Sequence, residues 1–223
     1  MVSFALRTAA ALGFLAIAGT ASAATLITSD AGYTGPDLQI GSIGQPYYLF
    51  TGGPTALPGG VTFSSTTANS VIGTGGYGLG SNGFSNAPII GLNSSNDTMT
   101  LTFDTAIASF GLGINYAPGY GDPVIAAYDG SGTLIASFNL ASLAPISTPG
   151  AFNAFAFRGI DGGGTAIKSF TLSGAYIIAS ANTGSPPPAV GGVPEPSTWA
   201  MLIVGFGFVG SAMRNRRTTR RMV

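Results

Sequence analysis

The sequence predicts an all-β fold, namely an antiparallel β-sandwich of the jelly-roll type. Three observations lead to this class. Apolar residues recur at every second position, clusters of glycine with aspartate or serine separate these runs, and no helical crossover joins them. Chains made of many short strands without crossover helices fold as antiparallel sandwiches or barrels.

The expected strands follow this alternation along the chain. It is clearest where Met99, Leu101 and Phe103 alternate with threonines. Two turn signals, Asp129-Gly130-Ser131-Gly132 and Asp161-Gly162-Gly163-Gly164, predict hairpins between neighbouring runs. In chain order the expected strands are 47–51, 61–66, 88–92, 98–103, 110–116, 123–129, 134–140, 154–159 and 167–179.

The first half of the domain is less clearly patterned than the second. From Thr51 to Asn86 the chain is rich in glycine, most of all between Gly73 and Gly80. A phosphate-binding loop would need a preceding strand, a following helix and, in the Walker type, a lysine, and these are lacking here. The stretch from Gly73 to Gly80 is therefore predicted to be a surface loop.

Both ends of the chain differ from this central domain. Residues 1–23 have the form of a signal peptide, because Arg7 precedes an apolar stretch and Ala21-Ser22-Ala23 supplies a small-x-small cleavage site. Cleavage by signal peptidase would leave Ala24 as the mature N-terminus. The sandwich domain is expected over 24–181, and a linker rich in proline and glycine follows over 182–193.

The final segment, 194–223, combines a short motif, an apolar run and a basic end. The run 199–213 contains no charged residue and, as a helix, would be roughly 22 Å long, against a bilayer core of about 30 Å. This predicts a short transmembrane helix that anchors the protein only transiently. The basic end, which favours a cytoplasmic C-terminus, consists of Arg214, Arg216, Arg217, Arg220 and Arg221.

This segment resembles the PEP-CTERM sorting signal. The resemblance is carried by the apolar run, the arginines and five motif residues, which are Pro194, Glu195, Pro196, Trp199 and Ala200. It implies a Gram-negative bacterium that makes exopolysaccharide, and an exosortase, an intramembrane cysteine transpeptidase, that removes the tail. The protein would then pass to the cell surface or the extracellular biofilm matrix.

The domain itself also shows a resemblance. Phe110-Gly111, the hairpin sequence 128–132 and the strand sequence 155–160 are similar to sandwich domains that often precede this sorting signal. Some relatives of such sandwiches bind glycans. The resemblance supports the fold more than any particular function.

Charge and cysteine content limit the possible partners of the mature domain. Between Ala24 and Pro196 the chain has eight carboxylates and two basic residues, Arg158 and Lys168, which gives a formal charge of −6. An acidic domain disfavours nucleic acid and anionic membrane surfaces as partners. The chain contains no cysteine, so its stability has to come from the core without disulfides.

We expect no enzymatic activity from this composition. Without histidine and cysteine, the chain lacks the commonest general base and the thiol nucleophiles. A glycosidase would need two facing carboxyl groups, and most aspartates here lie beside turn-forming residues. No organic cofactor is expected, and calcium is the one metal that aspartate and loop oxygens would suit. Its candidate ligands are Asp122, Asp129 and Asp161.

Two functions remain open. The first is a structural protein of the surface or matrix, associated with exopolysaccharide. The second is a glycan-binding, lectin-like module, assisted by calcium, whose aromatic rings stack on sugars. The loop 116–122 is the predicted exposed aromatic loop, and its proposed glycan contacts are Tyr116, Tyr120 and Asp122. Packing of these rings in the core is the alternative for each of them.

Overall fold

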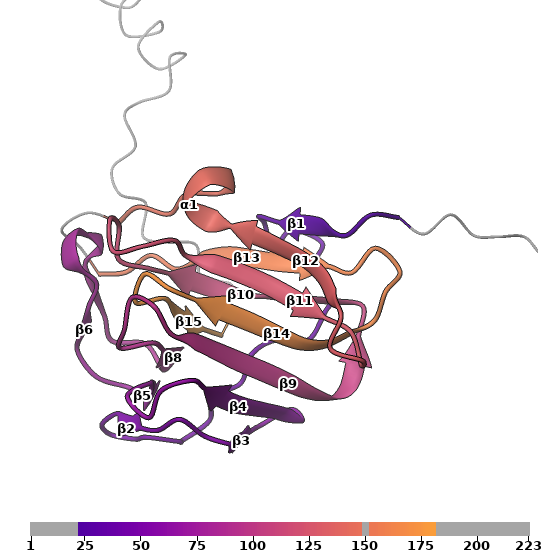
Figure 1. Cartoon of the computed structure of the whole chain (residues 1–223). Helices are drawn as coiled ribbons and strands as arrows, with labels where there is room; N and C mark the ends of the chain where they lie inside the picture. Colours follow the sequence, from indigo (N-terminus) through magenta and orange to yellow (C-terminus); the bar gives the residue numbers. More distant parts are fainter. Residues whose placement is uncertain (1–21, 149–151, 182–223) are drawn as a thin grey trace, which may run out of the picture. The chain divides into compact units, whose positions relative to one another are not determined.

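Two antiparallel sheets form the domain, as Figure 1 shows. This computed structural model describes residues 22–148 and 152–181, so the signal peptide up to residue 21, the linker and the sorting segment lie outside the described residues. Within the described ranges, no helix is long and apolar enough to cross a membrane. The all-β antiparallel class predicted from the alternation is confirmed.

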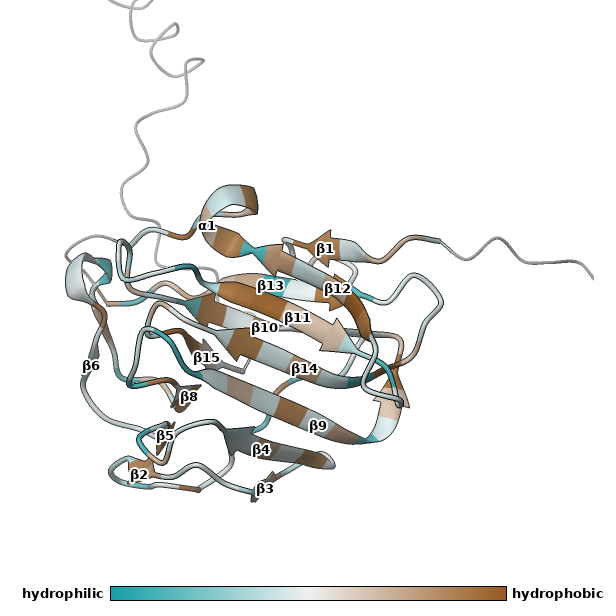
Figure 2. Cartoon of the chain, viewed as in Figure 1, coloured by the Kyte–Doolittle hydropathy of each residue, from teal (hydrophilic) through white to brown (hydrophobic). Residues whose placement is uncertain are grey.

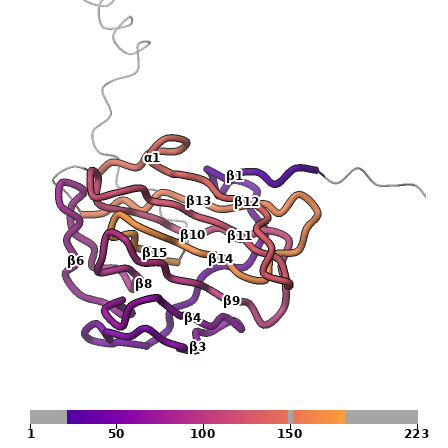
Figure 3. Tube along the Cα trace, viewed as in Figure 1, coloured from indigo at the N-terminus to yellow at the C-terminus, as the bar shows by residue number. Residues whose placement is uncertain are grey.

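The first sheet has seven strands in the order β1-β13-β10-β15-β8-β5-β2. Its strands are β1 (Thr25–Ile27), β2 (Leu49–Phe50), β5 (Val71–Gly73), β8 (Ile89–Gly91), β10 (Ser109–Asn115), β13 (Ala156–Asp161) and β15 (Ile178–Ser180). Although β1 and β2 are consecutive in the chain, they lie at opposite edges of this sheet, and the connection between them can be followed in Figure 3.

The second sheet has six strands in the order β12-β11-β14-β9-β4-β3. They are β3 (Thr55–Leu57), β4 (Val61–Ser65), β9 (Thr98–Ile107), β11 (Val124–Tyr128), β12 (Leu134–Asn139) and β14 (Ile167–Ser173). A small third sheet pairs β6 (Tyr77–Gly78) with β7 (Phe84–Ser85). The helical turns are η1 (Gly80–Asn82) between β6 and β7, and α1 (Leu140–Leu143) after β12.

The strands from β8 to β15 pair in a nested order. β11 pairs with β12, β10 with β13, β9 with β14 and β8 with β15, and each pair is antiparallel. The chain therefore behaves like one long hairpin that is rolled so that successive pairs alternate between the two sheets. This nested pairing is the connectivity of a jelly roll; β1, β2 and β5 extend the first sheet at its edges, and β3 and β4 extend the second.

The core lies between the two sheets. Phe110 of β10 is fully buried, and its ring centroid lies 4.8 Å from that of Phe103 in β9 and 5.2 Å from that of Phe170 in β14. Because β10 belongs to one sheet and β9 and β14 to the other, these contacts hold the sheets face to face. Figure 2 shows the alternation of apolar and polar residues along β9 and β14 that directs one face of each strand inward.

One expected strand proves to be two. The run 167–179 was predicted as one strand, but β14 ends at Ser173 and β15 begins at Ile178 in the other sheet. Between them Gly174, Ala175 and Tyr176 all have positive φ angles of 74°, 50° and 50°. This left-handed backbone turns the chain across the sandwich, and the alternation alone could not reveal it because apolar residues continue through the turn.

The prediction of a surface loop from Gly73 to Gly80 is correct for Gly76, Gly78 and Gly80, which are exposed, and wrong for Gly73 and Leu79, which are buried. Gly73 ends the buried strand β5, and the Leu79 side chain is 1% exposed. The Tyr77 hydroxyl donates a hydrogen bond of 2.6 Å to the carbonyl of Leu92, and the Tyr48 hydroxyl donates one of 2.7 Å to the carbonyl of Gly75. At Gly73 the backbone approaches the carbonyls of Gly44 and Tyr47 too closely for a Cβ atom, so this end of the stretch is packed into the domain.

Candidate functional site

Tyr116 does not lie in an exposed aromatic loop. Its side chain is 4% exposed, and its hydroxyl accepts a hydrogen bond of 3.1 Å from the backbone N–H of Ile146. The residues of β10 with even numbers point into the core, and Tyr116 continues that alternation beyond the last residue of the strand, Asn115. The predicted glycan contact through Tyr116 is therefore wrong, and core packing is its role.

Tyr120 and Asp122, the other two predicted contacts, are exposed. The Tyr120 side chain is 53% exposed, and its ring lies edge-on to that of Tyr176 with centroids 5.6 Å apart. A Cβ atom added to Gly80 would lie 3.4 Å from the Tyr120 ring, so this ring flanks the β6–β7 hairpin. The Tyr120 ring is thus accessible from solvent, whereas the Tyr116 ring is buried in the core.

Two further aromatic rings lie at the same hairpin. Phe84 is 59% exposed and Phe152 is 68% exposed, and the two residues form a parallel β-bridge. A Cβ atom added to Gly78 would lie 3.4 Å from the Phe84 ring. We call Phe84, Phe152 and Tyr120 together the hairpin aromatic surface. No sequence signal indicates Phe152, because no alternating run surrounds it.

A buried polar network lies beside Phe84 and Phe152. The Asn115 side-chain oxygen accepts hydrogen bonds from the Asn82 amide and from the Tyr116 N–H, while the Asn115 amide donates to Thr148 Oγ1 at 3.1 Å and to Asn153 Oδ1 at 2.6 Å. Asn82 belongs to η1, and Asn153 follows Phe152 directly. The network therefore ties the hairpin and the Phe152 segment to the end of β10.

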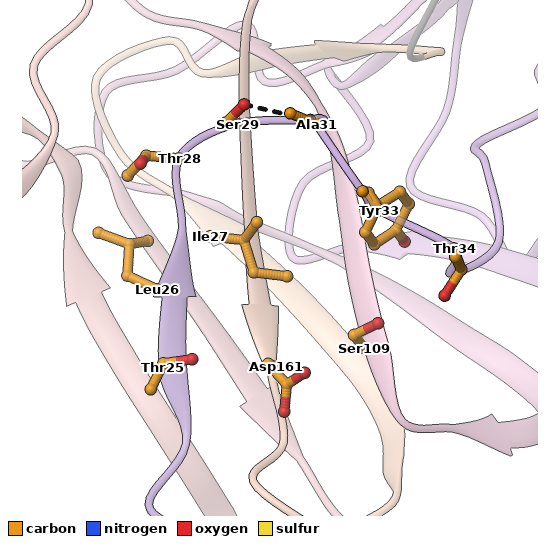
Figure 4. Close-up of a pocket in the computed structure, with 11 residues that line it drawn as sticks. Thr25, Leu26, Ile27, Thr28, Ser29, Ala31, Tyr33, Thr34, Ser109 and Asp161 are labelled. Carbon is orange, nitrogen blue, oxygen red and sulfur yellow. Dashed lines mark hydrogen bonds between the residues drawn. The ribbon is translucent and has the colours of Figure 1, made fainter.

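A concave site lies beside the edge strand β1, as Figure 4 shows. Its cavity measures about 430 Å³, and we call it the β1 pocket. Thr25 of β1 pairs in register with Asp161 of β13, which pairs in register with Ser109 of β10. Three polar side chains thus form a row across three strands. The lining also includes Tyr33. Further hydroxyl groups come from Thr28, Ser29 and Thr34, and the apolar or small lining residues are Leu26, Ile27, Ala31 and Gly32.

The three calcium candidates are not brought together. Asp122 lies before β11, Asp129 in the β11–β12 hairpin and Asp161 at the end of β13. Among residues 22–148 and 152–181, no three His, Cys, Asp or Glu side chains group as metal ligands would. Calcium binding at a single aspartate, completed by loop carbonyls, stays a prediction.

Asp129 has a local role that its turn sequence explains. Its Oδ1 atom accepts hydrogen bonds from the Ser131 hydroxyl at 2.7 Å, from the Ser131 N–H at 2.9 Å and from the Thr133 N–H at 2.9 Å. The hydrogen bond from the Ser131 hydroxyl, followed by that from the Thr133 N–H, lowers the pKa of Asp129. The Asp129 carboxylate therefore stabilises the turn between β11 and β12, in which it lies.

Asp129→Asn is expected to loosen the β11–β12 hairpin at neutral pH. Because the pKa of Asp129 is lower in the folded state, its stabilisation is fully present above the unfolded value of about 3.9 and is lost as the pH falls through the folded value. Hydrogen exchange of the Ser131 and Thr133 amides measures this. Asp104→Asn, a change at an exposed aspartate of β9, serves as the control. Equal exchange in the wild type and Asp129→Asn at neutral pH would contradict the assignment.

The C-terminal segment of the chain matches a known family. The family model described as the PEP-CTERM protein-sorting motif matches residues 192–217. The match includes all five predicted motif residues and Arg214, Arg216 and Arg217, whereas Arg220 and Arg221 lie beyond it. Comparison with the curated proteins and with the solved structures gives no match to the chain.

The chain therefore carries a PEP-CTERM sorting motif, and the resemblance found in its tail is confirmed. The motif implies an exported protein that is anchored in the membrane, processed by an exosortase and sorted to the surface. It does not describe what the sandwich domain does after delivery, because the matched residues all follow residue 181.

Proposed function

We propose that the mature sandwich domain is a non-catalytic structural component of the cell surface or biofilm matrix, associated with exopolysaccharide. The observation that carries this proposal is the sorting motif at residues 192–217. In this scheme, signal peptidase removes residues 1–23, the run 199–213 holds the protein in the membrane, and the exosortase then removes the tail.

The composition of the domain supports a role without catalysis. The chain has neither histidine nor cysteine, and the lining of the β1 pocket contains a single carboxylate, Asp161. Hydrolysis of a glycosidic bond commonly uses two carboxyl groups on opposite sides of the bond. The core formed by both sheets favours persistence, since the domain is stabilised by burial of large apolar side chains between them.

The processed protein is expected to begin at Ala24 and to end near Pro196. Fractionation of the native host, followed by intact-mass measurement of the protein from each fraction, tests both ends at once. A host that lacks its exosortase is the control, and it should retain the full C-terminal segment. Recovery of surface protein that still carries Arg221 from a competent host would overturn the proposed sorting route.

A second candidate function is glycan binding through the hairpin aromatic surface. Three rings, each more than half exposed, lie around one hairpin, which the hydrogen bond from Asn82 to Asn115 connects to the end of β10. A stacked ring contributes roughly 0.5–1.5 kcal/mol beyond burial, so one copy would bind a polysaccharide weakly. Many copies in a matrix would raise the effective affinity.

Affinity electrophoresis in gels that contain the host's exopolysaccharide tests this candidate. The double variant Phe84→Ala/Phe152→Ala is expected to lose most of the retardation, because it removes two of the three rings. Phe50→Ala, which changes an equally exposed ring on β2, is the matched control and should migrate like the wild type. A chelator added to one gel series tests assistance by calcium. Absence of retardation for the wild type would leave only the structural function.

A further inference from the structure

We propose that the β1 pocket binds a neutral sugar residue, with Asp161, Ser109 and Thr25 as its hydrogen-bonding groups. This inference rests on the glycan-binding candidate and deepens it, because it adds a second site distinct from the hairpin aromatic surface. The cavity of about 430 Å³ is in the lower part of the range of about 300–1,000 Å³ that small-molecule sites occupy.

The row of three side chains is placed by the sheet itself. Leu26, Ile160 and Phe110 pack in or against the core, so their neighbours Thr25, Asp161 and Ser109 point to the outer face of the first sheet. The antiparallel register then puts these three side chains next to one another on β1, β13 and β10, as Figure 4 shows. Groups that project from paired strands are held more firmly than groups on loops.

Several polar atoms of Thr25, Ser109 and Asp161 have no hydrogen-bond partner within the described residues. Asp161 Oδ1 accepts a hydrogen bond of 2.8 Å from the N–H of Gly163, whereas Oδ2 accepts none from the described part of the chain. The hydroxyls of Thr25 and Ser109 likewise make no hydrogen bond within residues 22–148 and 152–181. One carboxylate oxygen and two hydroxyls can therefore accept from and donate to the adjacent hydroxyls of a sugar.

The Tyr33 ring lines the pocket, and contacts within the domain fix its position. Its hydroxyl donates a hydrogen bond of 2.9 Å to the carbonyl of Pro36 and accepts one of 2.9 Å from the N–H of Gly111. Its ring lies 5.0 Å from that of Phe157. Burial raises the pKa of Tyr33 to about 12, so the phenol stays neutral at physiological pH. The ring is thus positioned before any ligand arrives, which lowers the entropic cost of binding.

The charge of the pocket selects among sugars. Asp161 is the charged residue in its lining. The guanidinium of Arg158, which is not a lining residue, donates a hydrogen bond of 3.3 Å to the backbone carbonyl of Thr28. An anionic sugar such as a uronic acid would be repelled by Asp161, whereas the hydroxyls of a neutral sugar donate favourably to a carboxylate. The pocket therefore suits a neutral residue within a polysaccharide.

Nuclear magnetic resonance titration of the isotope-labelled protein tests the proposal. The probes are the methyl glycosides of glucose, galactose and mannose, with glucuronate and methylamine as charged comparisons. At least one neutral glycoside is expected to shift the amide signals of Thr25, Ser109 and Asp161 in a saturable way. Shifts confined to Phe84, Phe152 and Tyr120 would overturn the pocket site while sparing the hairpin aromatic surface.

Variants make the test specific. Asp161→Asn keeps an acceptor for the Gly163 N–H but removes the charge, and it is expected to weaken binding roughly tenfold, as loss of a charged hydrogen bond does. Ser109→Ala is a second, milder variant, and Asp104→Asn in the other sheet is the control that should bind normally.

Three outcomes would each overturn the proposal. They are unchanged affinity in both pocket variants, stronger binding of glucuronate or methylamine, and no binding of any probe. The processing of the protein is measured separately by intact mass, so failure here leaves that result standing.

Discussion

Replacing Glu195 by alanine is expected to abolish removal of the C-terminal segment and to leave the exported protein in the membrane. Glu195 is the charged residue of the Pro194-Glu195-Pro196 triplet and lies inside the matched sorting motif. The apolar run 199–213 and the arginines after it remain in this variant, so the anchor persists while the recognised group is lost. Membrane fractionation with intact-mass measurement reads the outcome directly.

Two comparisons make this experiment decisive. Pro196→Ala is expected to give the same defect, whereas Ser197→Ala, one position beyond the triplet, is expected to be processed normally. Thermal unfolding of the domain should be the same in all three variants, because residues 24–181 are unchanged. Release of Glu195→Ala at the wild-type rate would show that this residue is not part of the recognised motif.

Phe110→Ala is expected to lower the free energy of unfolding by about 3–5 kcal/mol, the usual cost of removing a large buried aromatic side chain. The Phe110 ring is fully buried and contacts Phe103 and Phe170 of the opposite sheet. Its loss would leave a cavity at the place where the two sheets meet. Since domains of this size have only about 5–15 kcal/mol of stability, the loss is a large part of the total.

Urea denaturation of the protein measures this effect, and the Phe84→Ala variant is the matched control. The Phe84 side chain is more than half exposed, so its removal should change the unfolding free energy by no more than about 0.5 kcal/mol. A loss below about 1 kcal/mol for Phe110→Ala would mean that this ring does not hold the sheets together.

Local alternation predicted the long central strands well. The expected runs 98–103, 110–116, 123–129 and 134–140 correspond to β9, β10, β11 and β12, because a strand with one face in the core has to alternate over its whole length. The glycines and the proline of the loop 116–122 misled at Tyr116, because the alternation continues into the core beyond the end of β10. An apolar position at period two indicates burial, even when glycine and proline follow it.

Short strands were missed for a physical reason. β1, β3 and β6 contain two or three residues each, which is too few for a period to be read. They are strands because a neighbouring strand offers backbone hydrogen bonds, as β13 does for β1. Whether these short segments form strands therefore depends on residues elsewhere in the chain.

The sequence by itself determined the sorting motif, the acidic charge of the domain and the antiparallel β class, because each depends on residues that are adjacent or regularly spaced in the chain. Only the tertiary structure decided which aromatic rings are exposed and which polar side chains share a pocket. Thr25, Ser109 and Asp161 meet because strand pairing brings together segments that are far apart in the chain. That register is fixed by burial of the opposite faces of the same strands, and no local pattern records it.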